Sequence, residues 1–355
     1  MAATGKMRSG ARVRAAVGAI AVLASTAVTV VSAAPAAAAT TCNDVSLTVD
    51  AAVVVGPLPV GVPLPTEDWV INGRLCAPTG ASTVLLLQSG ATYSSEYWDF
   101  RFQPETYSFV DYANAHGLAT LNIDRLGIGT SSHPLPELVM TATHANIAHL
   151  FVQGLRSGQF GRSFSRVALA GHSFGSVVSV AEAGTYHDVD AVVLTALTHS
   201  VNTPFVTDFE AALRPAALVD PRFAGLPLGY LTTQAGARAS FFHQPTADPA
   251  VIAYEESVKE TFTDGENLML IPSVLDTLTI TAPVLTLVGQ RDVEFCGLVA
   301  DCSNPLSLVD LEGTFYPAAE SFELRVIPDT AHNVNLQGDT HATFDIITSW
   351  VTGAV

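Results

Sequence analysis

The sequence contains little positive charge. Its 355 residues include 16 lysine and arginine residues against 33 aspartate and glutamate residues, and the formal net charge at pH 7 is −17. Lysine is especially scarce, because Lys6 and Lys259 are the only two. A chain this acidic repels the phosphates of nucleic acids and of anionic membranes. We therefore expect no nucleic-acid partner, while the charge says little about a small-molecule substrate.

Long apolar runs are absent beyond the amino terminus. The one such run, residues 15–31, is followed by small residues at Ala37 and Ala39. The basic residues before the run are Lys6, Arg8, Arg12 and Arg14. This order is typical of a secretory signal peptide, so we predict a leader over residues 1–39 and a secreted protein. A transmembrane anchor is the alternative, but the run is at the lower limit for spanning a bilayer, and we expect no stable membrane anchoring.

Cysteine is also scarce, with four residues in the whole chain. An even number in an exported protein predicts two disulfides, for which three pairings are possible. We favour Cys42–Cys76, because this bond would join the start of one predicted strand to the end of the next. Cys296–Cys302 would then close a short loop. The chain has neither Cys-x-x-Cys spacing nor clustered histidines, so we expect no metal site.

Apolar segments of strand length alternate with helical patterns over residues 40–355. Several of these segments are continuous runs of Val, Leu and Ala, which suits strands covered on both faces. The alternation predicts a single α/β domain whose mostly parallel sheet has helices on both faces. The predicted strands are Val45–Val49, Trp69–Leu75, Thr83–Gln88, Ala119–Ile123, Val167–Ala170, Ala191–Thr195, Val284–Val288 and Glu323–Ile327. The predicted helices include one that ends at Gly158, with His144 and His149 on its face, and a last one over Thr340–Val351.

Residues 200–273 interrupt this alternation. They contain no convincing core strand, and they are rich in proline and aromatic residues. One segment predicts a helix that begins at Pro249 with Asp248 as its N-cap. We interpret the region as a helical cap, or lid, inserted between two strands of the sheet, because its aromatic side chains need an apolar surface to cover. A surface excursion without a role at the site is the alternative.

A serine stands at a predicted strand-to-helix corner. The residues Gly171-His172-Ser173-Phe174-Gly175 follow a buried strand and open a helix of small residues. A Gly-x-Ser-x-Gly sequence in this setting places the serine hydroxyl at the carboxyl edge of the sheet. The following helix would direct its N-terminal amides at a developing negative charge. We therefore predict that Ser173 is a nucleophile.

A serine nucleophile needs a base and a group that orients the base. Asp292 follows a late apolar strand and is our predicted acid, with Glu294 as the nearby alternative. His332 follows the last predicted strand and is our predicted base. The order Ser173, Asp292, His332 is the one expected for hydrolases with this strand corner. His133 and His199, which also follow strands, remain alternatives for the base.

Two backbone amides should bind the oxyanion that forms on the attacked carbonyl. The amide of Phe174, next to the nucleophile, is the first predicted donor. The second should come from the loop after an early strand, where Gly90 allows a tight turn. We assign it to Ala91, with Thr92 as the alternative.

Together these segments resemble the α/β-hydrolase superfamily over nearly the whole predicted mature chain. The resemblance is carried by the segments "SGAT", "DRLGIGTSSHP", "GHSFGS", "LVGQRD" and "DTAHNVNL". It implies an α/β-hydrolase fold with an eight-stranded sheet and a cap, no cofactor, and an acyl-enzyme formed on Ser173. Ser89 replaces the histidine that is usual in the oxyanion loop. Because the nucleophile is serine and not aspartate, the resemblance does not extend to haloalkane dehalogenases or most epoxide hydrolases.

The resemblance predicts a secreted serine hydrolase that cleaves an apolar carboxylic ester or lactone. Amide hydrolysis, acyl transfer, or cofactor-free lyase or perhydrolase chemistry on the same three residues is the first alternative. A non-catalytic binding protein of the same fold is the second. Four aromatic residues, Tyr93, Tyr97, Trp98 and Phe100, could line the substrate site or belong to the core. The partner is expected to be a small-molecule ester, and the sequence does not determine the oligomeric state.

Overall fold

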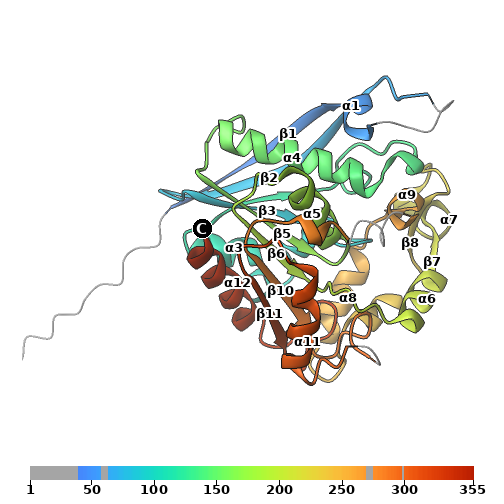
Figure 1. Cartoon of the computed structure of the whole chain (residues 1–355). Helices are drawn as coiled ribbons and strands as arrows, with labels where there is room; N and C mark the ends of the chain where they lie inside the picture. Colours follow the sequence, from blue (N-terminus) through green and yellow to red (C-terminus); the bar gives the residue numbers. More distant parts are fainter. Residues whose placement is uncertain (1–38, 57–62, 269–274, 298–299) are drawn as a thin grey trace, which may run out of the picture. The chain divides into compact units, whose positions relative to one another are not determined.

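A computed structural model describes residues 39–355, apart from residues 57–62, 269–274 and 298–299 (Figure 1). The predicted signal peptide, residues 1–39, lies outside the described residues except at its last position. In the described ranges, no helix has both the length and the apolar character that crossing a membrane requires.

The main sheet has eight strands in the order β1-β2-β4-β3-β5-β6-β10-β11. β2 runs antiparallel to both of its neighbours, β1 and β4, and the other pairings in this sheet are parallel. The strands are β1 (Thr40–Asp50), β2 (Asp68–Pro78), β3 (Thr83–Gln88), β4 (Ala119–Ile123), β5 (Arg166–His172), β6 (Ala191–Thr195), β10 (Val284–Gly289) and β11 (Phe322–Ile327). All eight predicted strands are present in this sheet, which confirms the predicted fold class.

Helices cover both faces of the sheet, and each face has its own apolar core. On β3, Val84 and Leu86 belong to one core, while Leu85 and Leu87 belong to the other, because successive side chains point to opposite faces. α4 and α5 pack over the first face, and α3 and α12 pack over the second (Figure 1). The helices are α1 (Ala51–Val55), α2 (Pro104–Tyr107), α3 (Phe109–Ala115), α4 (Thr141–Ser157), α5 (Phe174–Tyr186), α6 (Thr203–Ala212), α7 (Ala216–Val219), α8 (Pro249–Ser257), α9 (Asp264–Leu268), α11 (Pro305–Glu312) and α12 (Thr340–Ala354).

Two helix ends lie where a glycine and an N-cap aspartate in the sequence predict them. α4 is followed by Gly158, which has the left-handed φ of 83° that glycine adopts at helix ends. α8 begins at Pro249, and the side chain of Asp248 accepts a hydrogen bond from the amide of Ala250 at 2.8 Å. Both predicted helix boundaries are therefore confirmed.

Two disulfides are present, and both have the predicted pairing. Cys42 and Cys76 are opposite each other in the β1–β2 ladder, with their Cα atoms 4.0 Å apart. Cys296 and Cys302 close a loop after β10.

The insertion between β6 and β10 is not purely helical. It contains α6 to α9 and three short strands, β7 (Leu213–Pro215), β8 (Tyr230–Thr233) and β9 (Phe262–Thr263), which form a second, antiparallel sheet. None of these three strands joins the main sheet, in agreement with the expectation that the region holds no core strand, but the interpretation as a helical cap did not include them. Strands of two to four residues are too short to show an alternating pattern, and these pair only with one another. Residues 269–273 of the predicted cap lie outside the described residues.

Candidate active site

Ser173 occupies a strained corner between β5 and α5. Its φ of 52° and ψ of −119° are unusual for a residue with a side chain. The flanking glycines make this corner possible, because a Cβ on Gly171 would lie 2.3 Å from the carbonyl oxygen of Gly175. A Cβ on Gly175 would lie 2.2 Å from the carbonyl oxygen of Gln88. The amide of Ser173 donates to the carbonyl of Thr195 in β6 at 2.8 Å, which fixes the corner to the sheet.

The structure brings the predicted acid and base into contact. Nδ1 of His332 lies 3.0 Å from Oδ2 of Asp292, and both side chains are buried. Asp292 follows β10 and His332 follows β11, so two adjacent parallel strands deliver the pair to one edge of the sheet. Ser173 and His332 line the same cavity.

Glu294, the alternative acid, faces the other nitrogen of the same ring. Its Oε2 lies 3.5 Å from Nε2 of His332, on the side of the cavity. Burial lowers the pKa of His332, but the charges of Glu294 and Asp292 outweigh burial and raise this pKa to about 9. Burial raises the pKa of Glu294 to about 7, although the nearby imidazole opposes the rise. The imidazole therefore lies between two carboxyl groups, of which Asp292 alone contacts Nδ1.

The loop of residues 89–93 packs against Ser173 and the backbone of His172. A Cβ on Gly90 would lie 3.1 Å from the Cβ of Ser173, so a side chain at this position would crowd Ser173. Ala91 and Phe174 line the cavity beside Ser173, whereas Thr92 is buried and does not line it. In the described part of the chain, the amides of Ala91 and Phe174 have no protein acceptor. This geometry favours Ala91 over Thr92 as the second oxyanion donor.

Arg125 holds the first part of the 89–93 loop. Its guanidinium donates from Nε to the carbonyl of Ser89 and from Nη2 to the carbonyl of Gly90, each at 3.0 Å. Arg125 also forms a buried ion pair with Glu266 of α9, and Nε2 of His144 lies 2.9 Å from the same carboxylate. His144, predicted to lie on a helix face, is thus a buried member of this network.

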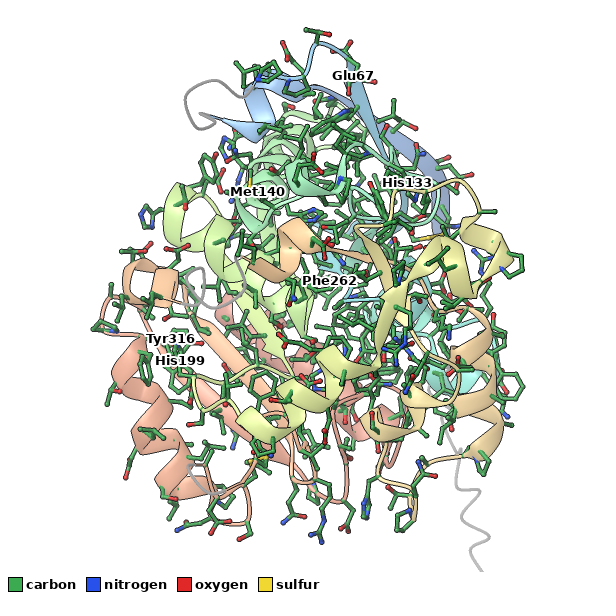
Figure 2. The ribbon with its side chains drawn as sticks, turned by 90° about the vertical axis from the view of Figure 1, so that its right-hand side faces the viewer. Glu67, His133, Met140, His199, Phe262 and Tyr316 are labelled. Carbon is green, nitrogen blue, oxygen red and sulfur yellow. A yellow bond between two sulfur atoms is a disulfide. The ribbon has the colours of Figure 1, made fainter. Side chains whose placement is uncertain are left out.

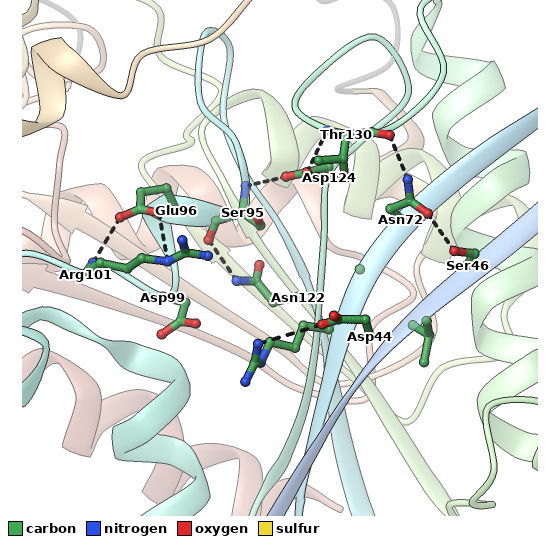
Figure 3. A pocket seen from close by; sticks show the side chains of 13 residues that line it. Asp44, Ser46, Asn72, Ser95, Glu96, Asp99, Arg101, Asn122, Asp124 and Thr130 are labelled. Carbon is green, nitrogen blue, oxygen red and sulfur yellow. Dashed lines mark hydrogen bonds and ion pairs between the residues drawn. The ribbon is translucent and has the colours of Figure 1, made fainter.

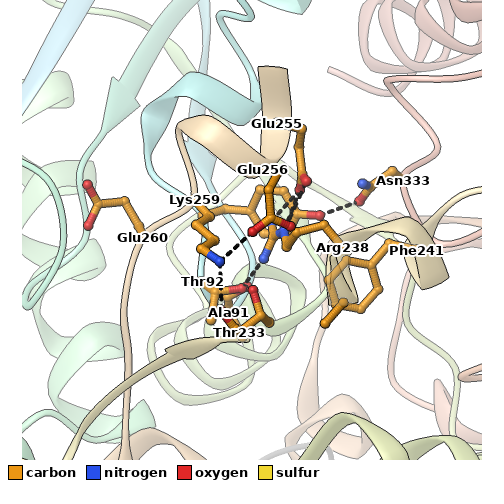
Figure 4. A network of polar contacts seen from close by, with 12 residues as sticks. Ala91, Thr92, Thr233, Arg238, Phe241, Glu255, Glu256, Lys259, Glu260 and Asn333 are labelled. Carbon is orange, nitrogen blue, oxygen red and sulfur yellow. Dashed lines mark hydrogen bonds and ion pairs between the residues drawn. The ribbon is translucent and has the colours of Figure 1, made fainter. Parts of the chain in front are cut away.

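Arg238 holds the second part of the loop. Its Nη1 donates to the hydroxyl of Thr92, and its Nε donates to Glu255 at 2.8 Å (Figure 4). The guanidinium lies 4.0 Å from the centre of the Tyr93 ring, and the Tyr93 hydroxyl donates to Asn333 at 2.8 Å.

The two glutamates that neutralise Arg125 and Arg238 both come from the insertion, so the insertion fixes the 89–93 loop. Sequence reasoning missed this role. Arg125 belongs to the segment "DRLGIGTSSHP", which was noted only for its resemblance, and Arg238 carries no signal of its own.

The cavity at Ser173 is mostly apolar and has a volume of about 530 Å³. Of the four aromatic residues near the loop, Tyr93 lines the cavity, while the other three are buried in the core. Phe262, near the centre of Figure 2, is one of the insertion residues that line it. The apolar lining is Ala91, Tyr93, Phe174, Val177, Leu197, Val201, Phe209, Phe241, Phe262, Leu275, Phe295 and Phe315.

The alternative histidines do not fit the role of base. His199 lines the cavity, but its Nδ1 lies 2.8 Å from Glu312 and its Nε2 lies 3.0 Å from the hydroxyl of Thr277, so both ring nitrogens are engaged. His133 packs near Tyr230 and does not line the cavity, and Figure 2 shows it well away from His199.

A second hollow, of about 420 Å³, is polar and contains none of the predicted site residues (Figure 3). Its central carboxylate, Asp124, accepts hydrogen bonds from the amides of Ser95 and Thr130 at 3.1 and 3.0 Å. Glu96 and Arg101 form an ion pair at its edge. These contacts give the hollow a structural role, because they fix the turns after β3 and β4.

Residues 84–345 match the model of the Alpha/beta hydrolase family. The chain belongs to this family. The alpha/beta hydrolase fold is also found in its structural neighbours, although their sequences are distant. A monoglyceride lipase from Saccharomyces cerevisiae is 14% identical, with a TM-score of 0.57, and the match covers 84% of this chain and 98% of that one. A putative hydrolase from Rickettsia typhi is 13% identical, with a TM-score of 0.56 and coverage of 89% and 100%.

A monoacylglycerol lipase from Paleococcus ferrophilus is 14% identical to this alpha/beta hydrolase, with a TM-score of 0.52 and coverage of 77% and 95%. Identities this low establish the shared fold and leave the substrate open. The chain matches none of the curated proteins.

Proposed function

We propose that this alpha/beta hydrolase is a secreted serine hydrolase that cleaves a carboxylic ester or lactone with an apolar acyl part. The observation that carries the proposal is the common position of Ser173 and His332 on one apolar cavity, with Asp292 bonded to the far side of the imidazole. A few polar groups in an otherwise apolar pocket favour a substrate with one reactive polar bond and apolar flanks.

The reaction begins when Nε2 of His332 takes the proton of the Ser173 hydroxyl as its oxygen attacks the ester carbonyl carbon. Asp292 keeps the imidazole in the tautomer that exposes Nε2 and stabilises the imidazolium. The amides of Phe174 and Ala91 donate to the oxyanion. The imidazolium then gives its proton to the leaving alkoxide oxygen, and an acyl group remains on Ser173. Water, deprotonated by His332 in turn, attacks the acyl carbon. The bond to the Ser173 oxygen then breaks, the imidazolium returns its proton to that oxygen, and the acid leaves.

Substitution of the nucleophile tests the proposal. We expect Ser173→Ala to lower kcat/KM on a panel of short and medium acyl esters by at least about a thousandfold. A fluorophosphonate probe should label the unchanged protein and not this variant. Ser307→Ala, at an exposed serine of α11, is the matched control and should retain both turnover and labelling.

Unchanged turnover in Ser173→Ala would contradict the proposed nucleophile. Labelling without ester turnover would point to another reaction of the same serine, for which amides and competing alcohols or peroxides belong in the panel. A chain that is neither labelled nor active would be a binding protein.

The proposal of secretion is supported by the two disulfides, which form in oxidising compartments. Expression of the full chain in a host with an export pathway tests it. We expect mature protein in the medium, with an intact mass that corresponds to cleavage near residue 39. Uncleaved protein retained inside the cell would contradict it.

A further inference from the structure

Three potential metal ligands meet on the side of the sheet covered by α4 and α5, away from the Ser173 cavity. They are His149 of α4, Glu182 of α5 and Asp188, which precedes β6. The imidazole nitrogen and the carboxylate oxygens that they offer lie within 4.8 Å of one another. Glu182 is fully buried, whereas His149 and Asp188 are partly open to solvent.

Four buried polar atoms of this cluster have no hydrogen-bond partner among the described residues. Both carboxylate oxygens of Glu182 and Oδ1 of Asp188 are buried, and no described residue donates a hydrogen bond to them. The group beside the Glu182 carboxyl is the carboxylate of Asp188, so the two acidic groups face each other without a donor between them. Nδ1 of His149 lies 2.8 Å from Oδ2 of Asp188, but without the alignment of a hydrogen bond. A buried carboxyl group without partners is unfavourable unless it binds a cation or takes up a proton. The two neighbours of Glu182 make a cation the better explanation, because both can ligate it.

The two partly exposed ligands are held in place by other residues. Nε2 of Gln153 donates to Oδ2 of Asp188 at 2.6 Å, and Nη2 of Arg156 donates to the backbone carbonyl of Asp188 at 2.6 Å. The ring of His149 stacks on Tyr186, with the ring centres 3.8 Å apart. Such supporting contacts orient the ligands of protein metal sites.

We propose that His149, Glu182 and Asp188 bind a divalent zinc ion. One imidazole nitrogen and two carboxylate oxygens are ligands that zinc accepts, and water would complete a tetrahedral site from the open side. Calcium fits less well, because it takes six to eight oxygen ligands. Bonds of about 2.0 to 2.2 Å to one zinc ion require the ligand atoms to lie somewhat closer together than the 4.8 Å within which they now fall.

The zinc ion would join α4 to the carboxyl-terminal end of α5, the helix that begins directly after Ser173. Its role would be to stabilise this helix pair. The sequence alone does not reveal the site, because its ligands are separated by 33 and then six residues, without a short metal-binding motif.

Calorimetric titration of the metal-free mature protein with zinc chloride tests the proposal, and calcium chloride serves as the comparison. We expect one zinc ion to bind per chain, no calcium binding at the same concentration, and a rise in Tm of roughly 5 °C in excess zinc. His149→Ala and Glu182→Gln should each weaken zinc binding at least about tenfold and remove the Tm shift. Glu182→Gln keeps the shape of the buried side chain, so it should fold.

His187→Asn is the matched control, because His187 is an exposed neighbouring histidine with a left-handed φ that asparagine tolerates. It should bind zinc like the unchanged protein. Equal zinc binding in the unchanged protein, His149→Ala and Glu182→Gln would overturn the proposal. Absence of zinc binding in the unchanged protein would also overturn it. These readouts do not depend on ester hydrolysis.

Discussion

Asp292 and Glu294, two residues apart in the loop after β10, face opposite nitrogens of one imidazole. Oδ2 of Asp292 lies 3.0 Å from Nδ1 of His332, and Oε2 of Glu294 lies 3.5 Å from Nε2. In the proposed mechanism, the first contact orients the catalytic base. The second places a carboxyl group beside the nitrogen that would receive the proton of Ser173. The two carboxylates together favour the imidazolium, which is the inactive form of a general base.

The position of Glu294 predicts the pH dependence of hydrolysis. His332 acts as a base only when it is neutral, and its pKa in the free protein is raised to about 9. We therefore expect kcat/KM to rise with pH up to about pH 9. Glu294→Gln removes one of the charges that raise this pKa, so the acid limb should move to lower pH by about one unit or more. The pH profile of kcat/KM for both proteins measures the shift. An acid limb that stays in place would mean that Glu294 does not control the charge of His332.

Asp292 should affect the rate far more than Glu294 does. Asp292→Asn replaces the acceptor at Nδ1 with an amide and favours the wrong tautomer of His332, so we expect kcat to fall by about 10⁴-fold. Glu294→Gln, measured at the optimum pH of each protein, should change kcat by less than about tenfold. Steady-state kinetics with one ester distinguishes the two. An equal loss in both variants would show that the two carboxylates share the orienting role.

The pair Arg238–Glu255 should contribute strongly to stability, because both side chains are buried. Glu255→Gln leaves the Arg238 guanidinium without its counter-charge, and we expect the free energy of unfolding to fall by about 3 kcal/mol. Urea denaturation measures this change. Glu323→Gln, which breaks the exposed pair Glu323–Arg325, is the control and should cost less than about 1 kcal/mol. Similar small losses in both variants would argue against a tightly held 89–93 loop.

Gly175, two residues after Ser173, should tolerate no side chain. A Cβ on Gly175 would overlap the backbone of Gln88, which cannot move without disturbing β3, so we expect Gly175→Ala to lower the free energy of unfolding by about 3 kcal/mol. Labelling of Ser173 by a fluorophosphonate should also be lost. Gly353→Ala is the control, because a Cβ there meets no atom within 4 Å and lies in α12. It should leave stability unchanged or raise it by up to about 1 kcal/mol. Normal labelling of Gly175→Ala would contradict the tight corner.

Strands β3 to β6 and β10 were predictable because each is a largely apolar segment that is buried on both faces. The same regularity placed Ser173, Asp292 and His332 after strand ends, where side chains from distant segments converge. The strands at residues 213–215, 230–233 and 262–263 gave no such signal. Each is too short for an alternation of apolar and polar residues to be recognised in the sequence. The buried ion pairs of the insertion were also missed, since charged residues are usually exposed.

The sequence by itself determined the strand–helix alternation, the serine corner and the candidates for acid and base, because these follow from local patterns and chain order. It favoured one of three disulfide pairings, and the structure decided for that one. Only the tertiary structure decided which carboxylate contacts which nitrogen of His332. It also decided that Arg125 and Arg238 hold the 89–93 loop, and that His149, Glu182 and Asp188 meet. The physical reason is that these contacts join residues far apart in the chain. Their distances depend on how the loops and the insertion pack, and no periodic pattern in the sequence records that packing.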